Sequence, residues 1–155
     1  MLSMKAKYAL RALVALTLAQ PERLSARKIA QAANLPEKFL EAILVELRKG
    51  GLVSSTRGIA GGHTLARNAA QIMVGDVVRI IDGPIAPIRC ASVTAYKACE
   101  DCPDPESCAL RFLMGDVRDA MSDVIDFRSL RQFADETSRL VRSRNVEPSA
   151  EKEIS

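Results

Sequence analysis

LPEKFLEAILVELRKGGLVSSTRGIAGGHTLAR, residues 35–67, is the stretch that decides the fold. Its first half has apolar residues at three- and four-residue steps, which predicts an amphipathic helix ending at Gly50-Gly51. A short strand, a turn rich in glycine and a returning strand then follow, at residues 52–56, 57–62 and 63–65. The stretch therefore predicts a helix joined directly to a β-hairpin.

Two more helices are expected before it. Apolar spacing predicts the first from Lys5 to Gln20, where Pro21 stops it. Ser25 is a good N-cap for a short second helix that ends near Ala33. Asn34-Leu35-Pro36-Glu37 is the start signal of the third helix, with Asn34 as its capping residue. Three helices followed by a hairpin predict a winged helix-turn-helix.

The third helix has two different faces. A helical wheel gathers five apolar residues on one side, leaving a mixed polar face that suits a DNA major groove. An ordinary surface helix would show the same amphipathic pattern. The apolar side holds Phe39, Leu40, Ile43, Leu44 and Leu47. The candidate DNA-binding residues on this helix and the wing are Lys38, Glu41, Arg48, Arg57 and His63.

Arg57, at the base of the wing, is placed to enter a minor groove, although a plain surface arginine is the alternative. His63 is the only histidine, and it is expected to be structural or to contact phosphate rather than to bind metal. Charge supports a polyanionic partner: residues 1–67 have 11 Lys/Arg against 4 Asp/Glu, while residues 68–155 have 11 against 15. The predicted partner is double-stranded DNA.

Beyond the wing, Val74–Asp82 reads as a fourth helix and Cys108–Asp126 as a long fifth one. The long helix has an apolar seam suited to a two-fold homodimer, with packing against the winged helix as the alternative. A shorter helix capped by Ser129 follows. The seam consists of Leu110, Leu113, Val117, Ala120, Met121 and Val124. The expected divisions are a DNA-binding domain (1–83), a cysteine loop (84–108), dimerisation helices (109–142) and a disordered tail (143–155).

All four cysteines lie between residues 90 and 108, with the spacing C-x8-C-x2-C-x5-C. Four clustered thiols in a reducing compartment favour a metal site over a disulfide framework. Spacing alone leaves zinc and an iron–sulfur cluster nearly level, because four thiolates satisfy either. The candidate metal ligands are Cys90, Cys99, Cys102 and Cys108.

The chain resembles bacterial iron–sulfur winged-helix regulators of the IscR, NsrR and RirA kind. The resemblance rests on KYALRAL in the first helix, on residues 35–67 with their RGIAGG wing, and on the cysteine loop ending CALR. It implies a mainly α-helical homodimer whose DNA binding depends on a [2Fe–2S] or [4Fe–4S] cluster. Glu41 and Arg57 match positions that contact base or groove, and Cys90, Cys102 and Cys108 match the cluster cysteines.

Two positions depart from that family. The histidine that IscR-like proteins use as a ligand is replaced here by Arg111, and the NsrR-like carboxylate of the first helix by Lys7. Arginine stays protonated and cannot be a ligand. Cys99 is therefore the extra candidate for the fourth ligand. Because the spacing after Cys90 is longer than in the family, either Cys99 or Cys102 can be the core ligand.

The expected function is a transcription regulator, a repressor or activator, that senses iron, redox state, oxygen or nitric oxide. The alternatives are a structural zinc-binding protein and a redox protein working through the Cys99-x-x-Cys102 thiols. No enzymatic activity is expected. The sequence has no signal-peptide pattern and no apolar run of membrane-spanning length, so we expect a cytoplasmic protein without membrane contact.

Overall fold

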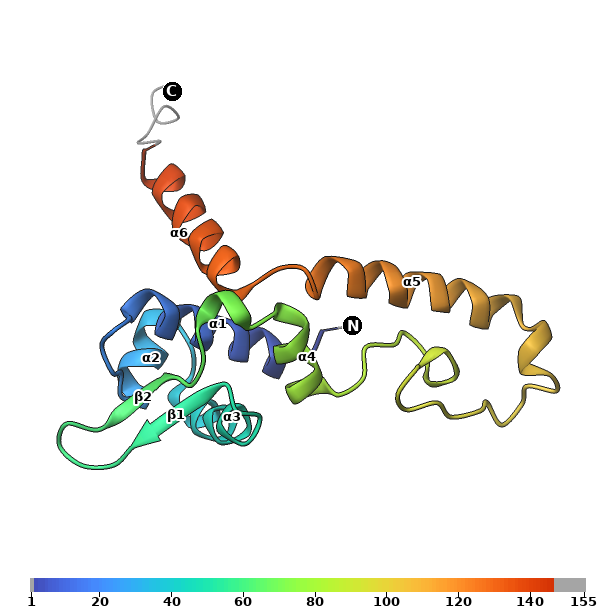
Figure 1. Cartoon of the computed structure of the whole chain (residues 1–155), viewed down its shortest axis with the longest axis horizontal. Coiled ribbons are helices and arrows are strands. Elements are labelled where there is room, and N and C mark those ends of the chain that lie inside the picture. Colours follow the sequence, from blue (N-terminus) through green and yellow to red (C-terminus); the bar gives the residue numbers. More distant parts are fainter. Residues whose placement is uncertain (1, 147–155) are drawn as a thin grey trace, which may run out of the picture.

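The computed structural model describes residues 2–146 and is mainly helical (Figure 1). A winged helix-turn-helix forms the core, and a long helix projects from it. The core elements are α1 (Met4–Ala19), α2 (Ala26–Ala33), α3 (Glu37–Lys49), β1 (Val53–Thr56), β2 (Gly62–Leu65) and α4 (Val74–Asp82). The projecting arm is α5 (Ala109–Ile125), and α6 (Leu130–Val146) returns to the core. The predicted fold class is confirmed.

α1 is the centre of the hydrophobic core. Its side chains Leu13 and Leu16 are fully buried, and the helix packs against α2, α3, α4 and α6. Ser3 caps its first turn by accepting a hydrogen bond from the Ala6 amide. Because the apolar stripe of α1 is wide, one helix can hold four others around it.

The turn between α2 and α3 differs from the prediction. Ser25 caps α2 as expected, accepting from the Lys28 amide at 3.2 Å. Asn34, however, is the C-cap of α2 and adopts the left-handed conformation, with φ at 52°. It does not cap α3, which begins after Pro36 without a side-chain cap. Asparagine tolerates this conformation better than most residues, so it can end one helix as well as begin another.

Phe39 is the second difference. Leu40, Ile43, Leu44 and Leu47 are buried as predicted, but Phe39 is 51% exposed, with the Lys38 ammonium 4.8 Å from its ring centroid. A helical wheel gives the direction of a side chain but cannot say whether a neighbouring element covers that turn.

The wing is a two-stranded antiparallel sheet with Val53 opposite Leu65 and Thr56 opposite Gly62. Leu24 and His63 exchange two backbone hydrogen bonds of 3.1 and 2.8 Å, which tie the wing to the segment before α2. At Gly62, φ is 147° and a Cβ would lie 2.9 Å from the Leu24 carbonyl oxygen. Glycine is therefore required where the wing approaches that segment.

α4 has the predicted bounds, Val74–Asp82, and packs on α1 and α3. The joint to the arm is an ion pair: Arg79 donates to both carboxylate oxygens of Asp126, at 2.6 and 2.7 Å. Gly75 makes room for this pair, because a Cβ there would lie 1.8 Å from Asp126 Oδ1. The start of α6 is also fixed, since the Leu130 amide donates to the Ile72 carbonyl at 2.7 Å.

α6 is longer than predicted. It continues to Val146 and is 17 residues long, the same length as α5. Residues 143–146, expected in the disordered tail, are therefore helical. The rest of the expected tail, 147–155, lies outside the described residues. Ser129 caps α6 as expected and accepts from the Gln132 amide at 3.2 Å. Within residues 2–146, no helix is long and apolar enough to cross a membrane.

Candidate metal centre and nucleic-acid interface

The polar face of α3 is accessible. Lys38, Glu41 and Arg48 are all exposed, and Arg57 is exposed at the first position after β1. α3 and the wing project from the same part of the core (Figure 1). This arrangement leaves a helix free to enter a groove and a hairpin free to contact the flanking backbone.

His63 belongs to β2 of the wing. Its Nδ1 is 2.8 Å from the Ser55 hydroxyl of the opposite strand. Partial burial lowers the pKa of His63 below its ordinary value, and the positive charge of Arg48 lowers it further. Both effects favour the neutral form of the imidazole.

The first two cysteines of the loop form a close pair. Cys90 belongs to a 3₁₀ turn, Arg89–Ala91, and is 7% exposed, whereas Cys99 is exposed. Their Sγ atoms are 3.5 Å apart. Two thiolates on one tetrahedral metal ion would lie about 3.8 Å apart, given a metal–sulfur distance of about 2.3 Å. The hydrogen bond to Cys90 is the main reason why the pKa of the Cys99 thiol is raised.

Cys102 and Cys108 form the second part of the set. Cys108 is the residue just before α5, and it lies close enough to Cys102 to raise the pKa of that thiol, after the larger effect of desolvation. In the described part of the chain, no three His, Cys, Asp or Glu side chains already stand together as a metal site. The structure therefore brings Cys90 to Cys99 and Cys102 towards Cys108, without assembling all four.

The chemistry of these donors fits a thiolate-ligated metal group. Four sulfurs lie in 19 residues, and residues 93–101 between them are all exposed. Such a loop has no core of its own to maintain its shape, and a bound metal supplies order where a core cannot. Thiolates suit iron–sulfur clusters and zinc equally in this respect.

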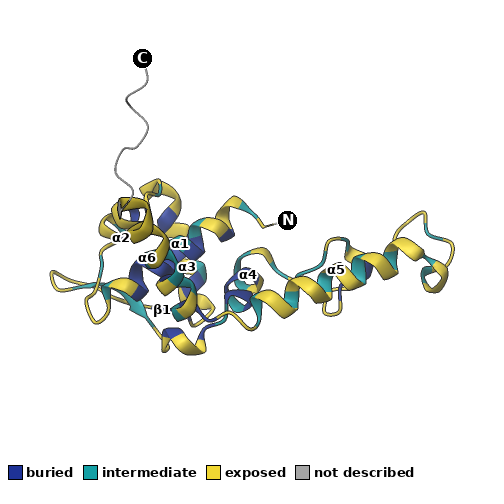
Figure 2. Ribbon diagram, turned by 90° about the horizontal axis from the view of Figure 1, so that it is seen from above, coloured by how far each residue is buried: buried dark blue, intermediate teal, exposed yellow. Residues whose placement is uncertain are grey.

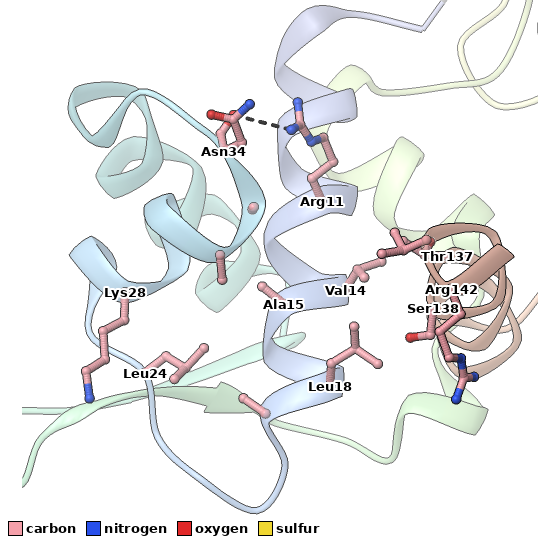
Figure 3. Close-up of a pocket in the computed structure, with 14 residues that line it drawn as sticks. Arg11, Val14, Ala15, Leu18, Leu24, Lys28, Asn34, Thr137, Ser138 and Arg142 are labelled. Carbon is pink, nitrogen blue, oxygen red and sulfur yellow. Dashed lines mark hydrogen bonds between the residues drawn. The ribbon is translucent and has the colours of Figure 1, made fainter. Parts of the chain in front are cut away.

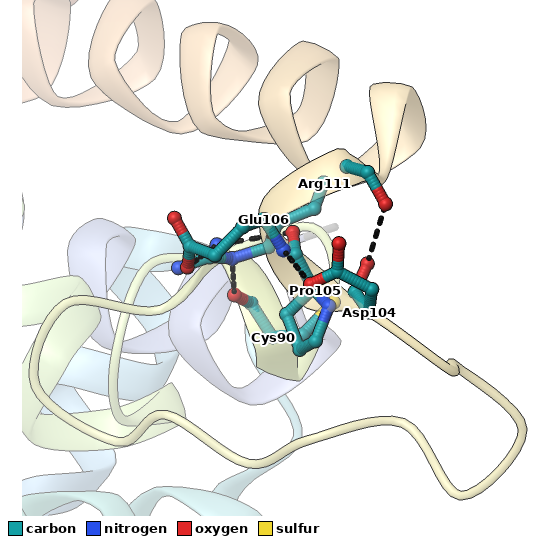
Figure 4. A network of polar contacts seen from close by, with 6 residues as sticks. Cys90, Asp104, Pro105, Glu106 and Arg111 are labelled. Carbon is teal, nitrogen blue, oxygen red and sulfur yellow. Dashed lines mark hydrogen bonds and ion pairs between the residues drawn. The ribbon is translucent and has the colours of Figure 1, made fainter.

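Arg111 has a structural role that the sequence did not predict; the sequence only excluded it as a metal ligand. It lies in the first turn of α5, and its guanidinium donates to the Cys90 carbonyl at 3.1 Å and the Pro105 carbonyl at 3.2 Å (Figure 4). It also pairs with Glu106 at 2.9 Å. The sequence signal was only its position three residues after the last cysteine. Lys7, the other departure, is exposed on α1.

A separate groove of about 850 Å³ lies between α1, α2 and α6 (Figure 3). Val14, Leu18 and Val141 make its surface mainly apolar, and no cysteine lines it. The groove is thus distinct from the cysteine loop.

The arm beside the loop is exposed along its length. No residue of α5 is buried (Figure 2), and several of its large apolar side chains are exposed. The exposed seam residues are Leu110, Leu113, Val117, Met121 and Val124. A contiguous apolar face on a projecting helix marks an interaction surface.

The Rrf2 family model, described as an iron-dependent transcriptional regulator, matches residues 2–136. An rrf2-like HTH-type transcriptional regulator of Rhodobacter capsulatus is 41% identical over 121 residues, which cover 76% of this chain and 81% of that protein. CymR of Bacillus subtilis is 35% identical over 137 residues, covering 88% and 91%.

Two solved structures are similar to this chain in both fold and sequence. The structure of CymR, the global cysteine regulator of B. subtilis, has a TM-score of 0.71 at 34% identity and covers 88% of this chain and 97% of that one. The structure of T. potens IscR has a TM-score of 0.69 at 27% identity and covers 88% of each chain. CymR is thus described as a cysteine regulator, whereas the family model is described as iron-dependent.

Proposed function

The chain belongs to the Rrf2 family of transcriptional regulators, and we propose that it is a homodimeric one whose DNA binding is controlled by an iron–sulfur cluster. It is a helix-turn-helix regulator, not an enzyme. The observation that carries the cluster proposal is the set of four thiols on a loop that begins in the core and ends at the arm. Residues 1–83 bind DNA, 84–108 hold the cluster and 109–142 form the dimer.

The proposed DNA contacts come from α3 and the wing. Lys38 and Arg48 neutralise phosphate or reach base edges, and Arg57 enters a minor groove. Glu41 repels phosphate, so its use is selection: a carboxylate accepts from cytosine N4 and penalises other bases. His63, hydrogen-bonded to Ser55, would support the wing and contact the DNA backbone.

The proposed ligands are Cys90, Cys99, Cys102 and Cys108. A [2Fe–2S] or [4Fe–4S] cluster would supply a redox centre that oxygen, nitric oxide or iron shortage can change. Zinc is the second candidate, and the 3.5 Å separation of Cys90 and Cys99 favours it as well, because one metal ion takes two thiolates at about that distance.

We propose that α5 forms the dimer interface. Its exposed seam is a poor surface for a monomer, and a two-fold axis would cover the seams of both copies at once. Two winged helices would then face a palindromic site. Since the loop joins the core to the start of α5, loss of the cluster would loosen the relation between arm and winged helix.

The test is purification without air. Iron and sulfide are measured per chain, and the visible spectrum is recorded with affinity for a palindromic site, for holo and apo protein. We expect a coloured protein with iron, sulfide and a DNA affinity that changes on cluster removal. A colourless protein with one zinc per chain would replace the iron–sulfur proposal with the zinc one.

A further inference from the structure

We propose that Arg111 is the positioning residue of the metal centre: it fixes both ends of the cysteine loop on α5 and places a permanent positive charge beside the thiolates. This inference rests on the proposed iron–sulfur function and assigns a role in it to a residue that is not a ligand. The evidence is a set of contacts that converge on one guanidinium.

The contacts join segments far apart in the chain. Arg111 Nε donates to the carbonyl of Cys90, 21 residues away, and Nη1 donates to the carbonyl of Pro105, six residues away. The Tyr96 ring, from the middle of the loop, has its centroid 5.6 Å from the guanidinium carbon. The planar fork of arginine can serve several acceptors at once, which a lysine ammonium on a flexible chain cannot do in the same geometry.

The ion pair with Glu106 is the weakest part of this clamp. The side chain of Arg111 is 28% exposed, but that of Glu106 is 81% exposed, so solvent screens their attraction. The two backbone carbonyls are the acceptors that determine the shape of the loop. Since one of them belongs to Cys90, the position of the first ligand depends directly on Arg111.

Arg118 extends the clamp along the same helix. It donates to the Ala91 carbonyl, the next one after that of Cys90. Positions 111 and 118 are seven residues apart and lie on one face of α5, so the helix holds two consecutive carbonyls of the Cys90 turn. If the Cys90 turn moved, it would therefore have to break these contacts with α5, the proposed dimer helix.

Charge gives Arg111 a second effect. Four thiolate ligands make a metal centre strongly negative, and adding an electron makes it more so. A fixed guanidinium near Cys90 stabilises the more negative, reduced form and so raises the reduction potential. Neutral replacements should lower the potential, while a lysine should preserve much of it.

The experiment compares Arg111→Gln and Arg111→Lys with wild type, and Arg139→Gln is the matched control. Arg139 forms an ion pair with Glu136 inside α6 and does not touch the loop. Three measurements are made on the full chain: hydrogen exchange of residues 89–108 in the apo protein, the half-time of iron loss to a chelator, and the reduction potential.

We expect faster exchange in both Arg111 variants and iron loss about 10–100-fold faster, the usual effect of removing a partner that orients ligands. The potential should fall in Arg111→Gln and stay near wild type in Arg111→Lys, which a purely structural role would not produce. Arg139→Gln should match wild type throughout.

Unchanged exchange and iron loss in Arg111→Gln would overturn the clamp. Equal potentials in Arg111→Gln and wild type would overturn the charge effect. Iron content of the wild type tests the proposed function separately: if no chain holds iron, the charge effect falls with it, while apo exchange still decides whether Arg111 fixes the loop.

Discussion

If the chain forms the proposed α5 dimer, replacing Leu113 and Val117 with aspartate should convert it into monomers. Leu113 is 55% and Val117 is 37% exposed in one chain. Complete burial of such side chains is worth roughly 1.5–3 kcal/mol. Covering these exposed fractions therefore contributes about 1.5 kcal/mol per chain, or about 3 kcal/mol for two copies. At about 1.4 kcal/mol per factor of ten, dimerisation weakens at least about 100-fold, and four interfacial carboxylates add repulsion.

The assay is sedimentation velocity over a range of concentrations, with circular dichroism to show that the helices persist. The matched control places aspartate at Leu140 and Val141 of α6, which are each 54% exposed. This variant adds the same charges to a similarly exposed apolar surface without touching α5, and it should remain dimeric.

The reasoning is refuted if the α5 variant sediments as an unchanged dimer. Equal dissociation of both variants would also count against it, because the effect would then follow from added charge rather than from the seam. The monomeric variant should in addition lose the preference for a palindrome over a single half-site.

Arg57→Ala should weaken binding to the palindromic site by about 1–3 kcal/mol in a fluorescence anisotropy titration, and unchanged affinity would remove its groove contact. Glu41→Ala should broaden the sequences selected from a randomised pool while the overall affinity stays similar, so uniform weakening would argue against base selection. Cys99→Ala should lose its cluster after anaerobic reconstitution, and an unchanged spectrum would make Cys99 a bystander. The pKa of Asp126 is lowered chiefly by its hydrogen bond from Arg79, so the pair stabilises the fold above the ordinary carboxyl pKa and loses this effect as pH falls through the lower folded value. Arg79→Met should thus cost at most about 1 kcal/mol in urea unfolding at pH 7, since both groups are partly exposed, and a deficit that does not shrink with acid would exclude the pair.

The sequence by itself determined the order and type of the core elements. The helix over Val74–Asp82 has the bounds that its apolar spacing predicts. The two strands of the hairpin lie on either side of the glycine-rich turn, as its sequence predicts. These features depend on residues within a few positions of one another, because hydrophobic period and turn chemistry act locally. The cysteine spacing was also enough to locate the candidate metal ligands, which remain a prediction.

Only the tertiary structure decided which surfaces were covered and which distant groups met. It left Phe39 exposed, made Asn34 the end of α2, and carried α6 on to Val146. It also brought the Cys90 carbonyl to Arg111 across 21 residues, which no local pattern encodes. Such contacts depend on how the arm leaves the core at the Arg79–Asp126 joint, and therefore on packing between elements rather than on the propensity of any one of them.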